Sequence, residues 1–517
     1  MAASVVSRSS SSFDTFAYRS RPKVTIELAG QKDGLVNSYT TGDCIEGSVT
    51  VTAEHDTRFD EIEITFEGTS KTSVERATMP GRTGAYQTFL RLRQPLEPSA
   101  YPTPCVLEAG RAYEFPFTFV VPERLLPHAC SHKKTNIHVE RAHTLLPPSL
   151  GDPMLASNGK TLLDDLSPTM SCIAYLIHAS VLRKPASATP AKSLASAGKK
   201  VRVIPMVDEE PPLNITDNED GYCIRKEKNV KRGAMRSKLG RLVVKASQPK
   251  PVQLSPPDSA TSDSVSSAAT IHLRFDPVSD DEQPPRLGTV WSRLRVSTFY
   301  SAEPWGDFPS LVCPIVWAHM GRGSYTETVP LSTMCVALAQ WTKHSPATST
   351  TGSLGRCDSL QSTSSDESLA GPTACFAGGV YYTASVVVPI TLPKSKAFVP
   401  TFHSCLVSRI YALDLTVSYH TPNANILTPS ASLRVPIQLT CRPRAATLPK
   451  PTEVEITQQE VDAEFFTPRT VTSSTTVPES ELFLVGRRQP QFQQPPEYSV
   501  IPAPNVPVLQ TNMSPRV

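Results

Sequence analysis

The sequence has no long apolar run and little excess charge of either sign. Nowhere do 18 apolar residues follow one another, so we expect no membrane-spanning helix. The 51 Lys and Arg nearly balance the 48 Asp and Glu, which does not point to nucleic acid as a partner. The eleven cysteines are scattered singly without a CxxC pair, as is typical of reduced thiols in the cytosol. These features predict a soluble cytoplasmic protein.

Signatures of catalysis are missing as well. We find no nucleophile elbow, phosphate loop or paired metal-ligand pattern, so we expect neither an enzyme nor a cofactor. The densest group of potential ligands is PHACSHKKTNIHVERAH, which contains Cys130 with His128, His132, His138 and His143. Imidazole and thiolate are zinc ligands, but this spacing matches no structural zinc pattern. A polar surface loop is the preferred interpretation, and we expect no metal.

Proline and a period of two dominate what is present. The 49 prolines oppose long helices, because proline removes a backbone donor and clashes with the preceding turn. Apolar and polar residues alternate in many short stretches, which predicts antiparallel strands with one buried face. The clearest stretches are residues 24–28, 61–67, 113–119, 271–275, 411–419 and 433–439. Two such sets, before about residue 200 and after about residue 234, predict an all-β protein of two tandem β-sandwiches. Pro116 within its stretch suggests an edge strand.

Composition then divides the chain. We expect a disordered start over residues 1–20, in preference to a transit peptide, because the stretch is Ser-rich and lacks a long apolar segment. A final stretch rich in Pro, Gln, Thr and Ser cannot bury enough apolar surface to fold alone. The expected parts are an N-terminal domain at 21–200, a basic interdomain linker at 201–233, a C-terminal domain at 234–445 and a disordered tail at 446–517.

A Ser-rich insertion at residues 344–372 interrupts the second domain and is predicted to be disordered. Within it, Ser364 stands three residues before Glu367, an acidic context that some kinases prefer. Phosphorylation would add charge to the insertion. Ser364 is therefore a candidate phosphorylation site, and a Ser-rich string without a regulatory role is the alternative.

A basic run lies at residues 224–245, with nine Lys or Arg against one Glu. Such a segment can lie on anionic lipid headgroups, at about 1 kcal/mol per charge near the surface. Lys231, Arg232, Arg236 and Lys238 are the candidate lipid-contacting residues. A solvated linker leading into the next strand is the preferred interpretation, and the two are compatible.

Near the end of the chain, Pro495, Pro496 and Tyr498 form a PPxY motif, PPEY. In an extended polyproline conformation the two prolines fit an aromatic-lined groove, and the tyrosine fits a neighbouring pocket. Random placement of this composition would give such a tetrapeptide with a probability of roughly 0.12 per chain. The motif alone is therefore suggestive of a ligand for such a groove, and its meaning depends on the rest of the chain.

Several segments resemble the fungal α-arrestins. FHSCLVSRIYALDLTVSYH, at residues 402–420, resembles the late strand of their C-terminal domain, and SKLGRLVVKASQPKPVQL resembles the opening of that domain. YEFPFTFVVPERLLP, HTLLPPSLGDP and MSCIAYLIHASVLR resemble parts of the N-terminal domain. The resemblance covers roughly residues 21–440.

This resemblance implies two arrestin-like sandwiches of immunoglobulin type and a tail whose PPxY binds WW domains of a HECT-type ubiquitin ligase. It implies an adaptor that contacts cytosolic regions of plasma-membrane transporters or receptors, so that ubiquitin placed on this cargo promotes its endocytosis. Catalysis would belong to the ligase. The implied location is the cytoplasm, with peripheral recruitment to the plasma membrane and endosomes. The alternative is a receptor-coupled signalling scaffold, such as one for ambient pH sensing, without cargo turnover.

Overall fold

The computed structural model describes most of the chain between residues 21 and 441. The described ranges are 21–31, 34–75, 81–184, 191–215, 221–232, 238–255, 266–310, 312, 321–345, 370–374, 376–421 and 428–441. Within them, strands predominate, and the α-helices are the short α1 (Ile137–His143) and α2 (Pro153–Ala156). The prediction of an all-β fold is confirmed. None of the helices in these ranges has the length and apolar character that a membrane crossing requires.

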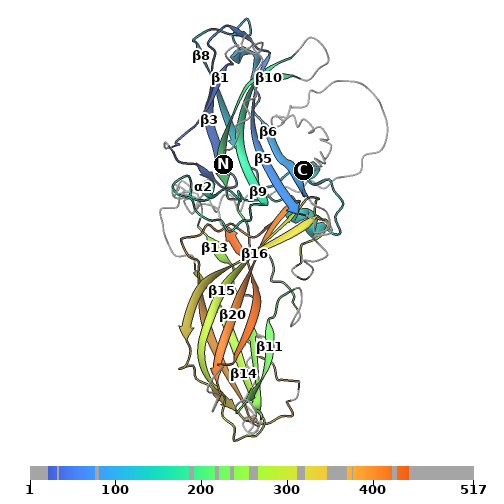
Figure 1. The fold of residues 1–517 in the computed structure, drawn as a ribbon, viewed down its shortest axis with the longest axis vertical. Coiled ribbons are helices and arrows are strands. Elements are labelled where there is room, and N and C mark those ends of the chain that lie inside the picture. Colours follow the sequence, from blue (N-terminus) through green and yellow to red (C-terminus); the bar gives the residue numbers. More distant parts are fainter. Residues whose placement is uncertain are drawn as a thin grey trace, which may run out of the picture. The chain divides into compact units, whose positions relative to one another are not determined.

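Two sheets enclose a first hydrophobic core, drawn mainly in blue and green in Figure 1. The three-stranded sheet has the order β1 (Lys23–Leu28), β3 (Cys44–Thr52) and β8 (Ala112–Val120). The five-stranded sheet has the order β2 (Ser38–Tyr39), β10 (Lys192–Val203), β9 (Ser171–Arg183), β5 (Glu61–Glu75) and β6 (Arg82–Arg93). Strict alternation buries every second residue of β8, and β8 is an edge strand, as Pro116 predicts.

Aromatic side chains join these two sheets across the core. The Phe66 ring of β5 lies 5.8 Å from the Tyr175 ring of β9 and 6.0 Å from the Phe119 ring of β8, measured between centroids. All three side chains are buried. The Tyr175 hydroxyl donates a hydrogen bond to the Pro147 carbonyl at 2.5 Å, so its polar end is satisfied inside the core.

A second pair of sheets encloses a separate hydrophobic core. One has the order β11 (Arg225–Lys231), β12 (Lys238–Ala246), β14 (Ser266–Pro277), β18 (Tyr381–Thr391) and β17 (Thr342–His344). The other has the order β16 (Arg322–Cys335), β15 (Arg286–Ser301), β20 (Val407–His420) and β19 (Phe402–His403), and β21 (Ser430–Ile437) also pairs with β20. Two small sheets pair β4 (Thr57–Arg58) with β7 (Val106–Leu107), and β13 (Val252–Leu254) with β22 (Leu439–Cys441).

The interpretation of residues 201–233 as a linker is wrong at both ends. Residues 201–203 complete β10, with Val201 and Val203 buried. Arg225–Lys231 form β11, which pairs antiparallel with β12 from Arg225 opposite Lys245 to Lys231 opposite Lys238. The strand escapes a search for apolar alternation because only Val230 in it is buried. It lies at a sheet edge, where charged side chains oppose pairing with another chain.

Candidate functional site

Several predicted site residues lie outside the described residues. These are Pro495, Pro496 and Tyr498 of PPEY, Ser364 of the Ser-rich insertion, and Arg236 of the basic run. Their roles stay predictions from the sequence.

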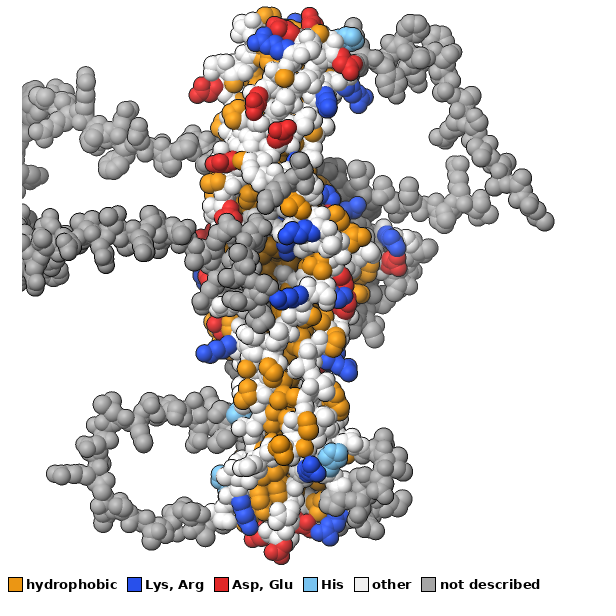
Figure 2. Space-filling view, turned by 90° about the vertical axis from the view of Figure 1, so that its left-hand side faces the viewer, with side chains coloured by type: hydrophobic (Ala, Val, Ile, Leu, Met, Phe, Trp, Pro, Cys, Tyr) orange, Lys and Arg blue, Asp and Glu red, His pale blue; other side chains and the backbone are white. Residues whose placement is uncertain are grey.

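The other basic residues lie where β11 ends and β12 begins, on either side of the connection between the two strands. Lys231 and Lys238 are exposed and directly opposite each other in the register. Arg232 is also exposed, but its Nη2 contacts both carboxylate oxygens of Glu282, at 2.9 and 3.1 Å. On the face that Figure 2 shows, basic and acidic side chains are interspersed. The lipid-contacting role of Lys231, Arg232 and Lys238 stays a prediction.

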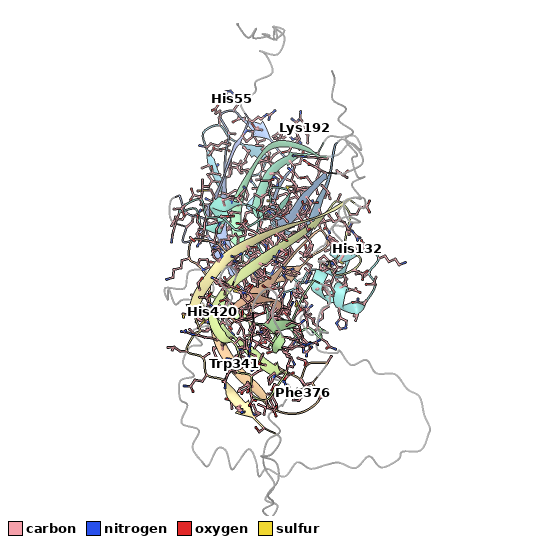
Figure 3. The ribbon with its side chains drawn as sticks, turned by 60° about the horizontal axis from the view of Figure 1, so that its bottom comes forward. His55, His132, Lys192, Trp341, Phe376 and His420 are labelled. Atoms are coloured by element: carbon pink, nitrogen blue, oxygen red, sulfur yellow. The ribbon has the colours of Figure 1, made fainter. Side chains whose placement is uncertain are left out.

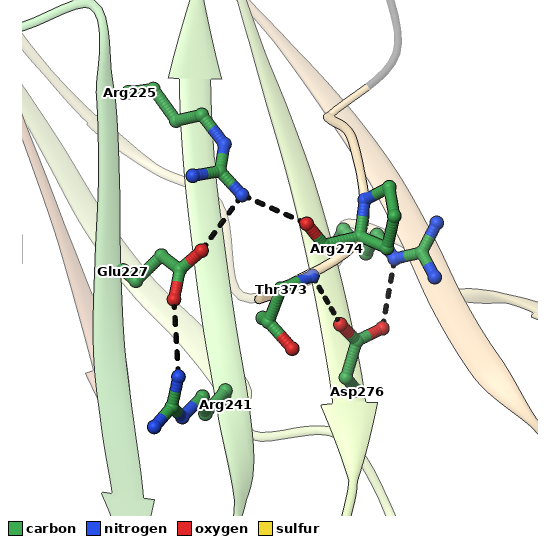
Figure 4. A network of polar contacts seen from close by, with 7 residues as sticks. Arg225, Glu227, Arg241, Arg274, Asp276 and Thr373 are labelled. Carbon is green, nitrogen blue, oxygen red and sulfur yellow. Dashed lines mark hydrogen bonds and ion pairs between the residues drawn. The ribbon is translucent and has the colours of Figure 1, made fainter. Parts of the chain in front are cut away.

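A network of polar contacts lies on the sheet that contains β11, β12 and β14, next to the residues that follow the Ser-rich insertion (Figure 4). Glu227 of β11 accepts from Arg225 at 2.8 Å and from Arg241 of β12 at 3.4 Å. Arg225 also donates to the Pro372 carbonyl at 3.0 Å. This network ties the residue that ends the predicted insertion to the edge of the sheet.

Asp276 of β14 binds Thr373, the residue that follows Pro372. It accepts from the Thr373 backbone N–H at 2.9 Å and from Arg274 Nε at 2.8 Å, and all three residues are buried. The Arg274 guanidinium lies 4.0 Å from the centroid of the Tyr381 ring. His344, at the other end of the insertion, stacks on Tyr381 at 4.6 Å. Both ends of residues 344–372 are therefore anchored on the same part of this sheet.

The structure gathers a cluster of two cysteines and two histidines, which we call the Cys–His cluster: Cys130, His132, His143 and Cys405. Cys130 ends the short 3-10 helix Pro127–Cys130, and His143 ends α1. Cys405 lies in the turn between β19 and β20. Figure 3 places His132 beside the helical segment that carries α1.

The interpretation of this stretch as a polar surface loop is wrong for Cys130 and His143. Each is 1% exposed, and Cys405 is 5% exposed, whereas His132 is half-buried. Helical turns bring the buried residues inward, because Val139, Ala142 and His143 share one face of α1. The helix begins where the Asn136 side chain accepts a hydrogen bond from the Val139 backbone N–H at 3.0 Å.

The potential ligand atoms of the Cys–His cluster all lie within 4.8 Å of one another. Cys130 Sγ is 3.2 Å from His132 Nε2 and 3.8 Å from His143 Nδ1. The other ring nitrogen of His132, Nδ1, is 3.1 Å from the Lys133 carbonyl oxygen. Because a carbonyl only accepts, Nδ1 donates this hydrogen bond, and Nε2 is the ring nitrogen that faces Cys130.

The two thiols of the Cys–His cluster differ in acidity. Hydrogen bonding from Cys405, and then from His143, lowers the pKa of Cys130 to about 4, although burial acts in the opposite direction. The same hydrogen bond to Cys130, together with burial, raises the pKa of Cys405. The pair therefore favours a thiolate at Cys130 that accepts a hydrogen bond from the Cys405 thiol.

Sequence reasoning found three residues of the Cys–His cluster and missed the fourth. Cys405 is far from the other three in the chain, and no spacing rule links a lone cysteine to a distant Cys–His stretch. His128 and His138, which the sequence groups with the cluster, are both exposed and outside it.

A buried arginine lies four residues after Cys405, in β20. Arg409 has no exposed surface. It donates from Nη1 to the Asp165 carbonyl at 2.6 Å and from Nη2 to the Leu166 carbonyl at 2.8 Å. It also donates to Thr298 Oγ1 from Nε at 3.1 Å and from Nη2 at 2.8 Å. Four hydrogen bonds thus satisfy a charge that would otherwise be costly to bury.

These contacts bind the backbone next to Leu166, which lies in the left-handed region. Leu166 has a φ of 59°, and its backbone N–H donates to Asp164 Oδ1 at 2.8 Å. The Leu166 side chain is buried in the second hydrophobic core. Lys396 Nζ binds Asp164 Oδ2 at 2.5 Å. The segment between α2 and β9 is therefore fixed to β20, through Arg409, and to the connection between β18 and β19, through Lys396.

Neither a protein-family model nor a curated protein matches the chain.

Proposed function

We propose that this protein is an arrestin-like adaptor that brings a HECT-type ubiquitin ligase to membrane transporters or receptors. Its β-sandwiches would contact cytosolic regions of the cargo, and Pro495, Pro496 and Tyr498 would bind a WW domain of the ligase. Ubiquitin transferred by the ligase would mark the cargo for endocytosis.

The observation that carries the proposal is the position of residues 402–420, the segment that most resembles an α-arrestin strand. These residues form β19 and β20, and β20 pairs with β15 on one side and β21 on the other. Its Arg409 is fully buried. The resemblance therefore falls on a central, packed strand, which supports a likeness of fold.

A fold by itself does not specify a function, so the adaptor role depends on PPEY. Proline restricts φ to about −65°, so two adjacent prolines favour the extended polyproline conformation before any partner binds. A preformed ligand loses less conformational entropy on binding. Tyr498 would then fill the pocket beside the proline groove, and its loss would remove a main contact.

Recruitment to a membrane would follow from cargo binding, with a contribution from the β11–β12 hairpin. Lys231 and Lys238 are exposed, and each charge near an anionic surface contributes about 1 kcal/mol. Arg232 contributes less, because Glu282 already neutralises it. A Lys231→Glu, Lys238→Glu double variant should bind anionic vesicles more weakly, and unchanged binding would remove the hairpin from the proposal.

The adaptor role is tested in cells that overexpress the full chain. Wild-type protein should lower the surface amount of a subset of transporters or receptors and increase their ubiquitination. Tyr498→Ala should abolish both effects, whereas Pro502→Ala, in the same Pro-rich stretch but outside the motif, should not. Unchanged surface proteins with an altered receptor signal would favour the signalling scaffold instead.

A further inference from the structure

The Cys–His cluster has the donors of a tetrahedral metal site. We propose that Cys130, His132, His143 and Cys405 bind one Zn²⁺ and so fasten the Pro127–His143 region to the turn before β20. Two thiolates and two imidazoles form one of the common donor sets of structural zinc sites. This inference does not depend on the adaptor role.

The distances in the Cys–His cluster suit this ion. Zinc lies about 2.3 Å from sulfur and about 2.0–2.1 Å from nitrogen, so tetrahedral geometry sets sulfur and nitrogen ligands about 3.6 Å apart. Cys130 Sγ lies 3.2 Å from His132 Nε2 and 3.8 Å from His143 Nδ1, on either side of that value. All four ligand atoms lie within 4.8 Å of one another, so closure needs shifts of only about 1 Å.

Charge and burial favour the metal-bound form. Two thiolates balance the two charges of Zn²⁺, and the imidazoles are neutral, so the site carries no net charge when loaded. Neutrality suits a cluster in which Cys130, His143 and Cys405 are buried. Four protein ligands leave no position open for substrate, which indicates a structural site. Sulfur and imidazole donors in a tetrahedron favour zinc over magnesium or calcium.

Contacts around the Cys–His cluster orient its ligands. His132 Nδ1 donates to the Lys133 carbonyl at 3.1 Å, which directs Nε2 to the site. Such outer hydrogen bonds are typical of histidines that bind metal, because they fix the tautomer and the ring orientation. The Lys134 ammonium donates to the Cys130 carbonyl at 2.7 Å and steadies the backbone between the two ligands.

We expect zinc to cross-link two segments that are far apart in the sequence and that no disulfide joins. Cys130, His132 and His143 come from one segment, and Cys405 comes from the turn that leads into β20. Because unfolded chains rarely preserve such a site, the free energy of zinc binding becomes free energy of folding. Removal of zinc should therefore loosen both segments together.

The test begins with metal analysis of the full chain, purified under reducing conditions from zinc-replete cells. We expect about one zinc per chain, and a loss of most of it in Cys130→Ser and in Cys405→Ser. His128→Ala and His138→Ala alter exposed histidines of the same stretch and should retain the metal. Cys441→Ser alters a buried cysteine outside the Cys–His cluster and should also retain it.

Wild-type protein supplies a second measurement that does not require a ligand variant to fold. X-ray absorption at the zinc edge should show two sulfur ligands at about 2.3 Å and two nitrogen ligands at about 2.0–2.1 Å. A chain that stays free of zinc after reconstitution would overturn the proposal. So would undiminished zinc in Cys405→Ser, or a Cys130–Cys405 disulfide trapped directly from the reducing cytosol.

Discussion

Arg409 should be one of the most sensitive positions of the chain. Replacing it by Met keeps most of the side-chain volume and removes the guanidinium. The change leaves the carbonyls of Asp165 and Leu166 and the hydroxyl of Thr298 without their donor. It also removes the contact that holds Leu166 at a φ of 59°.

The magnitude follows from these lost contacts. Each buried acceptor left unsatisfied costs about 1–3 kcal/mol, so three would cost several kcal/mol. The mutation also removes the cost of burying the charge, which offsets part of this sum. We expect Arg409→Met to lower the free energy of unfolding by about 3–5 kcal/mol. Arg295→Met is the matched control: Arg295 lies on the neighbouring β15, pairs with Asp414 and is 27% exposed, so it should cost about 0–1 kcal/mol.

Urea unfolding followed by tryptophan fluorescence measures the stability of both variants. Because a chain with two cores need not unfold in one step, amide hydrogen exchange should be measured as well. Arg409→Met should speed exchange in residues 164–167 and 404–411, and Arg295→Met should not. Equal losses in the two variants, or unchanged exchange in these segments, would refute the role assigned to Arg409.

Two further predictions concern the same region. Burial raises the pKa of the Asp165 carboxyl, so the folded state binds this proton more tightly than the unfolded chain. The free energy of unfolding should therefore fall as pH rises from the ordinary Asp pKa of about 3.9 through the raised pKa of Asp165. Asp165→Asn should flatten this part of the dependence of stability on pH. An unchanged slope, measured by urea unfolding at several pH values, would contradict this prediction. Gly151 has a φ of 81°, and an added Cβ would lie 2.5 Å from a backbone carbonyl oxygen, so Gly151→Ala should cost more than the roughly 1–2 kcal/mol of a left-handed residue. Gly110 has a φ of 74° and open space around it, so Gly110→Ala should show the backbone cost alone. Equal losses of stability in the two variants would mean that the Ser171 carbonyl near Gly151 moves aside at no cost.

Strands with strong apolar alternation could be predicted from the sequence. In β8, Tyr113, Phe115, Phe117 and Phe119 point inward as expected, because burying one face of a strand requires that pattern. β10 is the contrary case. Its Ser, Ala, Gly and Lys residues carry little apolar signal, yet it pairs along most of its length with β9, which supplies the large side chains.

The Cys–His cluster could be predicted only in part. The density of His and Cys in the stretch that contains Cys130, His132 and His143 marked it as a candidate site. His128 and His138 belong to the same stretch, yet both are exposed. The helical register of α1 buries His143 and leaves His138 exposed. The turn between β19 and β20 places Cys405 beside the other three residues. A local sequence pattern does not predict this long-range contact, so Cys405 could be found only from the fold.

The most direct test of the adaptor role is binding of the purified full chain to the WW domains of HECT-type ubiquitin ligases, measured by calorimetry. Wild-type protein and Pro502→Ala should bind with the same affinity, and Tyr498→Ala should lose binding, because the tyrosine pocket would be empty. Equal binding by wild type and Tyr498→Ala, or no binding to any WW domain, would contradict the adaptor role.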